Sequence, residues 1–511
     1  MNLHVIGIGG TGHRILKAII HLAAVGAFGI GGTPLNINIL TVDSDGGNAD
    51  FRNLQDVIRK YKAYQEVMTD RPRIITDEAK INWSPLATGT KTLSEYIERG
   101  SFINKELEEI IDFLYTEGEQ NTPLKNGFYG HPSIGSYIVN GELNSADAWT
   151  AFIESMNNDE NHCVFIIGSV YGGTGASGIP VITEKLKAAK SDVKVATLLS
   201  MPYFMPVGSP GSEDKISPQT AYFIPKTKGA LYYYEQQKYI DKVDSLYIVG
   251  ELDSNHWEKE PYSTGGPEQE HKAHISELFA AFACVDFYEK FSIWAKNKDT
   301  EKPIPMEGQN AIYVARRIEE NEIYPYTWDL IEMQNKNLAR QIQIFLLTSI
   351  LFTKVYNEEL GDEKASNPKI KNFSVKKEDK EKLYEYMKMF CSWINELHTK
   401  NQHEGNRIVR SVENDLVRLF KMYENRELID GNRDGSNPYD LKKFEYIING
   451  DREVTRRGLL GKTRTETEPR IIIPSRKILD IISRDMKENI TALPVFIAHV
   501  NEICAEILTE K

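Results

Sequence analysis

The feature that most constrains the fold is a strand pattern that runs directly into a glycine loop and then into a helix. Val164 to Ile167 form a short apolar run of the kind that fills the centre of a parallel sheet. The loop Gly172-Gly-Thr-Gly175 follows, and its glycines permit positive φ and a close backbone approach to a ligand. A helix predicted from Ile179 to Ala189 would direct its positive end to the same place. The segment predicts an anion site, and a tight strand-to-helix turn is the alternative for the tetrapeptide taken alone.

A second glycine loop lies at the N-terminus. The strand predicted at Leu3 to Ile6 leads into Gly7-Ile-Gly-Gly-Thr-Gly12 and then into a helix from His13 to Ala24. The next predicted strand, Asn36 to Val42, ends in Asp43-Ser-Asp45. One such loop followed by an acidic residue is typical of a dinucleotide-binding fold, in which the acid contacts the ribose. That fold gives no role to a second loop at residues 172 to 178.

The two loops, in this order and each after a strand, resemble those of the tubulin and FtsZ superfamily of nucleotide-binding proteins. Gly9-Gly-Thr-Gly12 matches the first loop of that family, and residues 171 to 177 match its Gly-Gly-Gly-Thr-Gly-Ser/Thr-Gly signature, with Tyr171 replacing the first glycine and Ala176 and Ser177 as further departures. Pro180 falls where the family also has proline. The resemblance implies an α/β fold with a Rossmann-type parallel sheet.

Further matches follow along the chain up to about residue 335. Asp43-Ser-Asp45 matches the acidic loop after the second strand, and Gly130-His-Pro-Ser-Ile-Gly135 resembles the loop that senses the terminal phosphate, with one residue fewer before its proline. Lys242 to Val249 resembles the family's helix-to-strand junction. The family reads guanine with an asparagine after that strand, and Glu251 stands nearby as an acidic acceptor for the guanine N–H groups.

Tyr326 to Gln334 resembles the acidic loop that tubulins and FtsZ insert into the nucleotide site of the next subunit. Asp329 and Glu332 are one helical turn apart, so both carboxylates can face one neighbour. Water that attacks a terminal phosphate must be oriented and deprotonated, and the resemblance implies that these acids do so in trans. The alternative is that Asp329 caps the following helix.

The resemblance implies that the base lies near the start of a helix predicted from Glu270 to Lys290, where His271 and His274 are candidates for stacking or are partly exposed polar residues. Candidate ligand-binding residues are Gly9, Gly10, Thr11, Gly12, Asp43, Asp45, Gly130, Ser133, Gly135, Gly172, Gly173, Thr174, Gly175, Ala176, Glu251, His271 and His274, and the candidate catalytic residues are Asp329 and Glu332. The implied cofactors are GTP or GDP, with Mg²⁺. A side chain at Gly173 or Gly175 is expected to fill the space of the phosphates.

The last third of the chain differs from that family. Helical spacing of apolar residues predicts helices at Ile331 to Leu360, Lys376 to His398, Arg407 to Tyr423 and Ala492 to Thr509, and one strand at Arg470 to Pro474. We therefore expect a nucleotide-binding domain at residues 1–290 with an insertion at about 52–128, a linker with the acidic loop at 291–335, and a mainly helical C-terminal domain at 336–511. The polar segment around Arg452, Arg456, Arg457, Lys462 and Arg464 is predicted to be a mobile loop.

Composition narrows the functional classes. A formal net charge of −12 argues against general affinity for nucleic acid or an anionic membrane. The four cysteines are scattered without a Cys-x-x-Cys pair, so zinc is not expected, and Cys163 and Cys284 are predicted to be core residues. The predicted N-terminal strand and the lack of a long apolar run favour a cytoplasmic protein without a membrane span.

Three functions agree with these patterns. The first is a tubulin-like GTPase that hydrolyses GTP at subunit contacts in an oligomer or filament. The second is a non-hydrolysing nucleotide-binding scaffold or switch that recruits a protein partner through its C-terminal helices. The third is a Rossmann-type oxidoreductase, which ranks lowest because no catalytic Tyr-x-x-x-Lys or His/Asp pair is evident.

Overall fold

The structure is a computed structural model that divides into two compact units. Unit 1 comprises Met1–Ala23, Phe28–Ile58 and Arg71–Ile323, and unit 2 comprises Ala24–Ala27, Arg59–Asp70 and Tyr324–Lys511. Among the described residues, no helix is both long and apolar enough to span a membrane. The described residues are 1–29, 35–45, 47–84, 92–99, 105–121, 124, 128, 131–156, 161–207, 220–250, 258–261, 271–298, 312–314, 318–319, 322–323, 335–355, 376–398, 423–424, 427–428, 446–448, 451–457, 463–469, 472–474 and 493–509.

Unit 1 is built on an eight-stranded parallel sheet in the order β10-β8-β6-β5-β1-β2-β3, with β4 paired to β2. The strands are β1 (Asn2–Ile8), β2 (Asn36–Val42), β3 (Arg73–Ile74), β4 (Asn82–Trp83), β5 (His162–Ser169), β6 (Lys194–Ser200), β8 (Ser245–Val249) and β10 (Ile312–Val314). From β1 the sheet continues through β2 to β3 on one side. From β5 it continues through β6 and β8 to β10 on the other side. The strand order therefore reverses between β1 and β5, and ligands bind α/β sheets beyond the carboxyl ends of strands at such a point.

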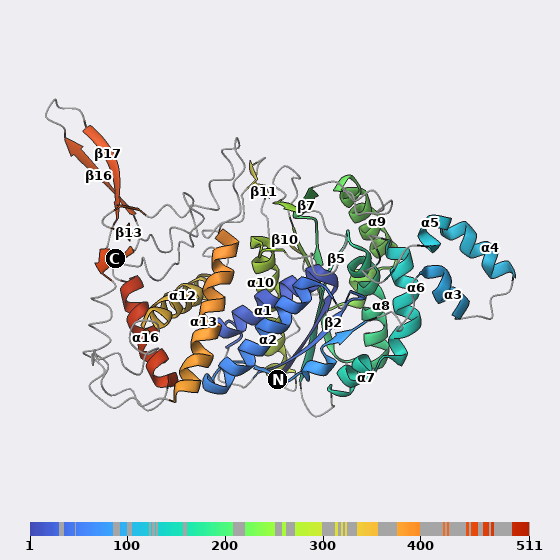
Figure 1. The fold of residues 1–511 in the computed structure, drawn as a ribbon, viewed down its shortest axis with the longest axis horizontal. Helices are drawn as coiled ribbons and strands as arrows, with labels where there is room; N and C mark the ends of the chain where they lie inside the picture. Colours follow the sequence, from blue (N-terminus) through green and yellow to red (C-terminus); the bar gives the residue numbers. More distant parts are fainter. Residues whose placement is uncertain are drawn as a thin grey trace. The chain divides into compact units, whose positions relative to one another are not determined.

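Helices cover both faces of this sheet. Figure 1 shows α6 (Pro132–Glu142), α7 (Asp147–Glu154) and α8 (Gly173–Ala189) on one face, and α1 (Gly9–Val25) and α10 (Ile275–Asn297) on the other. Successive side chains of β5 point to opposite faces of the sheet, so they pack alternately against the two helical layers. Val164 and Ile166 share a core with residues of α8, whereas the Phe165 ring lies 5.9 Å from that of Phe287 on α10. The fold is thus a Rossmann-type α/β fold, as predicted.

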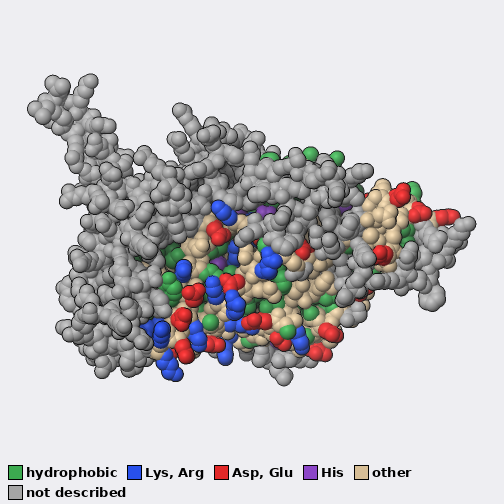
Figure 2. Space-filling view, viewed as in Figure 1, with side chains coloured by type: hydrophobic (Ala, Val, Ile, Leu, Met, Phe, Trp, Pro, Cys, Tyr) green, Lys and Arg blue, Asp and Glu red, His purple; other side chains and the backbone are tan. Residues whose placement is uncertain are grey.

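The remaining elements of unit 1 surround these layers. Between β4 and α6 lie the short helices α3 (Leu93–Arg99), α4 (Lys105–Leu114) and α5 (Glu117–Gln120). Helix α9 (Phe223–Gln236) precedes β8, and β7 (Phe204–Val207) pairs with β9 (Glu258–Pro261). Helix α2 (Ala49–Val67) begins in unit 1 and ends in unit 2. On the face shown in Figure 2, Lys and Arg side chains are interspersed with Asp and Glu among the described residues.

Unit 2 is mainly helical among its described residues. Its helices are α12 (Lys336–Val355), α13 (Lys377–His398) and α16 (Leu493–Thr509), and α12 packs against both of the others. The end of α2 joins them, because the Tyr64 ring lies 4.7 Å from the ring of Tyr386. Three of the four predicted C-terminal helices are therefore present. Of the fourth, predicted from Arg407, residues 407–422 lie outside the described residues, and Tyr423 forms a short strand with Glu424.

The C-terminal third contains more strands than the one predicted. That strand is present as β18 (Ile472–Pro474), paired with β15 (Tyr446–Ile448). In addition, β16 (Asp451–Arg457) and β17 (Thr463–Pro469) form an antiparallel hairpin where a loop was predicted. The prediction of a loop was wrong because it was based on Gly458, Gly461 and the basic residues of this segment. The stronger signal is Val454 with the threonines that recur along both segments, on either side of Gly458 and Gly461 in the sequence, a pattern typical of a hairpin.

Candidate functional site

The first glycine loop joins β1 directly to α1. Gly9 has a φ of 72°, a backbone conformation that L side chains rarely adopt, and α1 begins at this residue rather than at His13. Gly10 and Thr11 are half-buried, whereas Gly9 and Gly12 are buried. The first N–H groups of α1 have no partner within the helix, because the preceding residues belong to the strand. They are available as donors at the edge of the sheet.

The second glycine loop begins α8 in the same way. Gly172 is the N-cap residue, with φ −86° and ψ 168°, and its position carries no side-chain cap. Gly173, Thr174 and Gly175 form the first turn of α8, which starts six residues before the predicted Ile179. Their N–H groups are the donors that a capping side chain or an anion would accept. A helix N-terminus also carries a partial positive charge, so negative charge is favoured here.

The two loops meet although they lie far apart in the sequence. A Cβ atom added to Gly9 would lie 3.5 Å from the Cβ atom of Thr174 and 3.7 Å from the amide nitrogen of Gly175. Two helix N-termini therefore converge at the point between β1 and β5 where the strand order reverses.

A third helix, α6, begins beside α8. A Cβ atom at Gly135 would collide with Ser177 and would lie 2.7 Å from Cδ2 of Phe128. Gly135 therefore serves the packing of α6 against α8 and is buried. Ser133 is exposed in the first turn of α6, where its carbonyl oxygen accepts a hydrogen bond from the Tyr115 hydroxyl at 3.2 Å. Gly130 lies outside the described residues.

Two of the candidate glycines allow helices to pack closely against strand ends. A Cβ atom at Gly12 would lie 2.6 Å from the carbonyl carbon of Gly7, and one at Gly175 would lie 2.5 Å from the carbonyl oxygen of Ser169. The space beside Gly175 is thus filled by the backbone of β5. The expectation that a side chain at Gly175 would fill the phosphate space was wrong, because the Cβ direction points into the protein. Ala176 is buried and its carbonyl oxygen accepts from the Tyr234 hydroxyl at 2.8 Å.

The acidic loop after β2 is folded on itself. The Asp43 carboxylate accepts a hydrogen bond from the Asp45 amide at 3.2 Å, and the Asp45 carboxylate accepts one from the Gly47 amide at 3.1 Å. Burial raises the pKa of Asp43 to about 7. Burial likewise lowers the pKa of His13, whose Nδ1 lies 4.0 Å from Oδ2 of Asp43, to about 4. Both groups therefore sit beneath the first loop in surroundings that favour their neutral forms.

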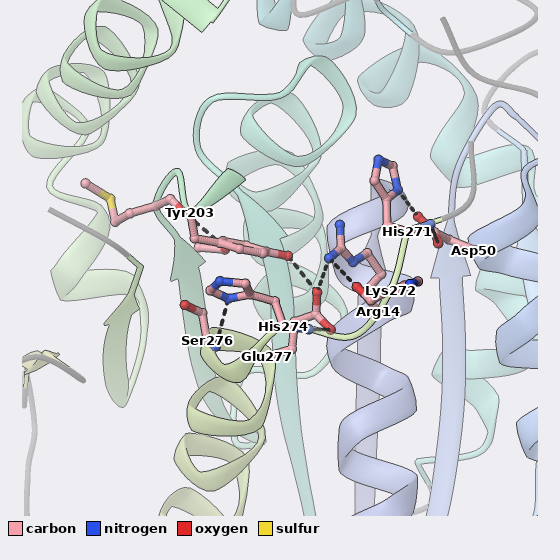
Figure 3. Close-up of polar contacts among 10 residues, drawn as sticks. Arg14, Asp50, Tyr203, His271, Lys272, His274, Ser276 and Glu277 are labelled. Atoms are coloured by element: carbon pink, nitrogen blue, oxygen red, sulfur yellow. Dashed lines mark hydrogen bonds and ion pairs between the residues drawn. The ribbon is translucent and has the colours of Figure 1, made fainter. Parts of the chain in front are cut away.

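A buried polar network ties α1 to the start of α10 (Figure 3). Arg14, the second residue after the glycine loop, forms an ion pair with the fully buried Glu277 and donates to the carbonyl oxygen of Lys272 at 3.1 Å. The hydroxyl of Tyr203, which follows β6, donates to Glu277 Oε1 at 3.0 Å. The Arg14 guanidinium also lies 5.5 Å from the centres of the Tyr203 and Phe204 rings. Arg14 thus fixes the first turns of α1 and α10 relative to one another.

Both candidate histidines on the base side make contacts within the protein. His274 caps α10, where its Nδ1 accepts from the Ser276 amide at 3.1 Å and its own amide donates to Glu277 Oε2 at 3.1 Å. His271 is buried, and its Nδ1 lies 2.8 Å from Oδ2 of Asp50. Burial alone would raise the pKa of Asp50, but the hydrogen bond and charge of His271 and the charge of Arg14 outweigh it and lower that pKa. These two histidines therefore fix the start of α10 and the residues that precede it.

Four predicted residues lie outside the described part of the chain, namely Gly130, Glu251, Asp329 and Glu332. The structure brings the two glycine loops together, sets Asp43 and Asp45 beside the first loop, and places Ser133 and Gly135 on the helix next to α8. Sequence reasoning missed Arg14, Asp50, Tyr203 and Glu277. An arginine directly after a glycine loop, at a position that helical spacing predicts to be buried, is the one signal that could have indicated this network.

The described residues contain no group of three or more His, Cys, Asp or Glu side chains that could hold a metal ion. All four cysteines are reduced and buried. Cys163 and Cys284 are core residues, as predicted, and burial raises the pKa of both thiols. The first N–H groups of the two helices, which have no partner within their own helix, and the positive φ of Gly9 suit a phosphate group. Mg²⁺ bound with a phosphate needs few protein ligands, because phosphate oxygens and water supply the rest.

Comparison with known proteins finds no matching family model and no matching curated protein. Similar solved structures are CetZ from Methanosaeta thermophila (14% identity, TM-score 0.29, covering 59% of this chain and 56% of that one) and CetZ1 from Haloferax volcanii, a GDP-bound monomer (15% identity, TM-score 0.30, 57% and 59%). A variant FtsZ from M. jannaschii is also similar (13% identity, TM-score 0.23, 49% and 46%).

The chain spans little more than half the length of the two CetZ proteins that it matches. All three TM-scores lie below 0.5.

Proposed function

We propose that this protein binds the phosphates of a guanine nucleotide where its two glycine loops meet. The observation that carries the proposal is the convergence of Gly9 with Thr174 and Gly175, at the N-termini of two helices. Backbone amides and helix dipoles then act on one ligand group, which is the usual way in which proteins hold phosphate. The half-buried Gly10, Thr11 and Gly172 leave this junction accessible.

The use of both loops favours a mononucleotide over a dinucleotide. A dinucleotide fold needs one glycine loop and an open acid after the second strand to contact the ribose. Asp43 occupies that position, but its carboxylate is buried, accepts from the Asp45 amide and faces His13. The second loop would have no role in such a site, whereas here it touches the first.

The proposal of guanine rests on the sequence motifs and on Glu251, whose carboxylate would accept from the guanine N–H groups. Hydrolysis would require a second copy of the chain, whose Asp329 and Glu332 would orient and deprotonate the attacking water. Mg²⁺ bound with the nucleotide would neutralise the phosphate charge. The nucleotide-binding copy would supply the amides of the two loops, which bind and orient the phosphates.

The direct test is equilibrium dialysis of the purified protein against GTP, GDP, ATP and NAD⁺, each with and without Mg²⁺. We expect GTP and GDP to bind at least about tenfold more tightly than ATP or NAD⁺, a difference of about 1.4 kcal/mol. Equal affinity for ATP and GTP would contradict the preference for guanine but would still support a phosphate site. Preferential binding of NAD⁺ would favour the oxidoreductase, and failure to bind any of the four would overturn the proposal.

A further inference from the structure

Tyr171 carries a buried hydroxyl group beside the two glycine loops. It lies between β5 and Gly172, the N-cap residue of α8. Tyr171 is 4% exposed, and its hydroxyl forms no hydrogen bond with any part of the chain that the structure describes. A buried hydroxyl without a partner is rare in proteins, because nothing compensates for its removal from water. The folding of this chain alone therefore does not explain the group.

The ring of Tyr171 is held by aromatic neighbours. Its centre lies 4.9 Å from that of Phe223 on α9 and 6.0 Å from that of Phe204 on β7. Together these residues form a small apolar cluster. The contacts involve the ring alone, so they fix the direction of the hydroxyl without using it. Packing therefore accounts for an aromatic ring at this position, but phenylalanine would pack equally well.

The Tyr171 hydroxyl lies close to the first glycine loop. Burial raises its pKa above the usual value for tyrosine, and Thr11 and Arg14 on α1 are near enough to oppose that rise. The hydroxyl therefore keeps its proton and remains a hydrogen-bond donor. Thr11 is half-buried, and a threonine on a helix can exchange between two χ1 rotamers. Such a rotation would open the hydroxyl to a ligand at the junction of the loops.

We propose that the Tyr171 hydroxyl donates a hydrogen bond to a phosphate oxygen of the ligand held by the two glycine loops. The inference rests on the proposed function, which places phosphates at this junction. The hydroxyl and the loop amides would then donate to the same anion, and hydrogen bonds to a charged acceptor are stronger than those between neutral groups. The family signature has glycine where this chain has Tyr171, so the donor is an addition to the motif.

The variant Tyr171→Phe removes the hydroxyl and keeps the ring, so it tests the inference directly. In equilibrium dialysis we expect it to bind GTP at least about tenfold more weakly than the wild type, as for the loss of a hydrogen bond to a charged group. Without ligand, its melting temperature should equal or exceed that of the wild type, because the hydroxyl makes no hydrogen bond in the folded protein. A purely structural hydroxyl would give the opposite result, a lower melting temperature with unchanged GTP affinity.

The matched control is Tyr239→Phe, which removes a buried hydroxyl that has partners. The Tyr239 hydroxyl lies 2.7 Å from that of Thr183 and 2.8 Å from that of Thr197. Thr183 lies about 15 Å along α8 from Gly173, at a rise of about 1.5 Å per residue. The control should therefore melt at a lower temperature than the wild type and keep its GTP affinity within about twofold.

The outcomes separate this inference from the proposed function. Wild-type GTP affinity in Tyr171→Phe, or equal weakening by Tyr239→Phe, would overturn the inference and leave the phosphate site in place. A lower melting temperature of ligand-free Tyr171→Phe would also overturn it, because the hydroxyl would then have a partner within the protein. A wild-type protein that binds no nucleotide would overturn the proposed function, and this inference with it.

Discussion

The glycines of the two loops serve different purposes, and each can be tested separately. Gly9 adopts a conformation that other residues avoid, whereas Gly12 and Gly175 make room for neighbouring backbone. Gly172 has an ordinary extended conformation and stands at an uncapped helix start. Substitutions at Gly175 should therefore affect folding, and substitutions at Gly172 should affect binding.

We predict that Gly175→Ala destabilises the protein. The added Cβ atom would lie 2.5 Å and 2.6 Å from the backbone oxygen and nitrogen of Ser169, and backbone atoms cannot move aside as a flexible side chain does. Overpacking of this kind costs about 1–3 kcal/mol. Urea unfolding measures the effect. Gly229→Ala is the control, because a Cβ atom at Gly229 on α9 meets nothing within 4 Å. If Gly175→Ala is as stable as the control, the start of α8 can move away from the end of β5 without cost, which would contradict the prediction.

A second residue-scale prediction concerns pH. The pKa of Asp43 is about 7 in the folded protein and about 3.9 when unfolded, so the folded state binds the proton more tightly. Asp43 therefore lowers stability progressively as pH rises through the window between these values. Asp43→Asn should melt at a higher temperature than the wild type at pH 8, with a smaller difference at pH 5. The difference between the two proteins isolates Asp43 from His13, whose lowered pKa acts in the opposite direction. A difference that does not change with pH would contradict the buried acid.

At the scale of elements, the Arg14–Glu277 pair joins the first turns of α1 and α10 in a place without solvent. We predict that Glu277→Ala costs about 3–5 kcal/mol, because it leaves a buried guanidinium without its counter-charge. Glu277→Gln retains the acceptor for the Tyr203 hydroxyl and should cost less. Chemical unfolding of Arg14→Leu, Glu277→Leu and the double variant completes the test. If the double variant loses as much as the sum of both single variants, the two residues are not coupled.

The strands and glycine loops could be predicted from sequence because their signals are local. An apolar run such as Val164 to Ile167 and a glycine-rich loop such as Gly9 to Gly12 need no knowledge of distant residues. Helices α1 and α8 begin earlier than predicted, at Gly9 and Gly173. Glycine is a poor helix former, so these first turns carry no helical signal in the sequence. The Arg14 network could not be predicted, since its members come from α1, α2, α10 and the segment after β6 and meet only in the folded protein.

At the scale of the whole molecule, the proposal places the phosphate site on one copy and the catalytic acids on another. It therefore predicts that specific GTPase activity depends on protein concentration. Specific GTPase activity should rise with protein concentration, because Asp329 and Glu332 would act on the nucleotide of a neighbour. Replacing both with alanine should lower turnover by about 10²-fold or more, within the range that a positioned general base supplies. Nucleotide affinity should change little.

A mixture of two variants, each inactive alone, tests catalysis between copies more directly. A Gly172→Asp protein would lack the phosphate site but keep both acids, so it should restore turnover to the double alanine variant. Activity that is independent of concentration, or a double alanine variant with wild-type turnover, would favour the nucleotide-binding scaffold over the GTPase.

The central claim, that phosphates bind at the junction of the two loops, is tested most directly by the GTP affinity of Gly172→Asp. An aspartate at this N-cap position would accept the same amides that the phosphate requires, and would add a like charge beside it. A Cβ atom at Gly172 would lie 2.7 Å from Oγ of Ser169, a hydroxyl that can rotate aside, so stability should change by no more than about a few tenths of a kcal/mol. The control is Gly229→Asp, with the same charge change at an exposed site. We predict at least about 100-fold weaker GTP binding by Gly172→Asp, with an unchanged or slightly higher melting temperature and wild-type binding by the control. Wild-type affinity in a folded Gly172→Asp protein would contradict the claim.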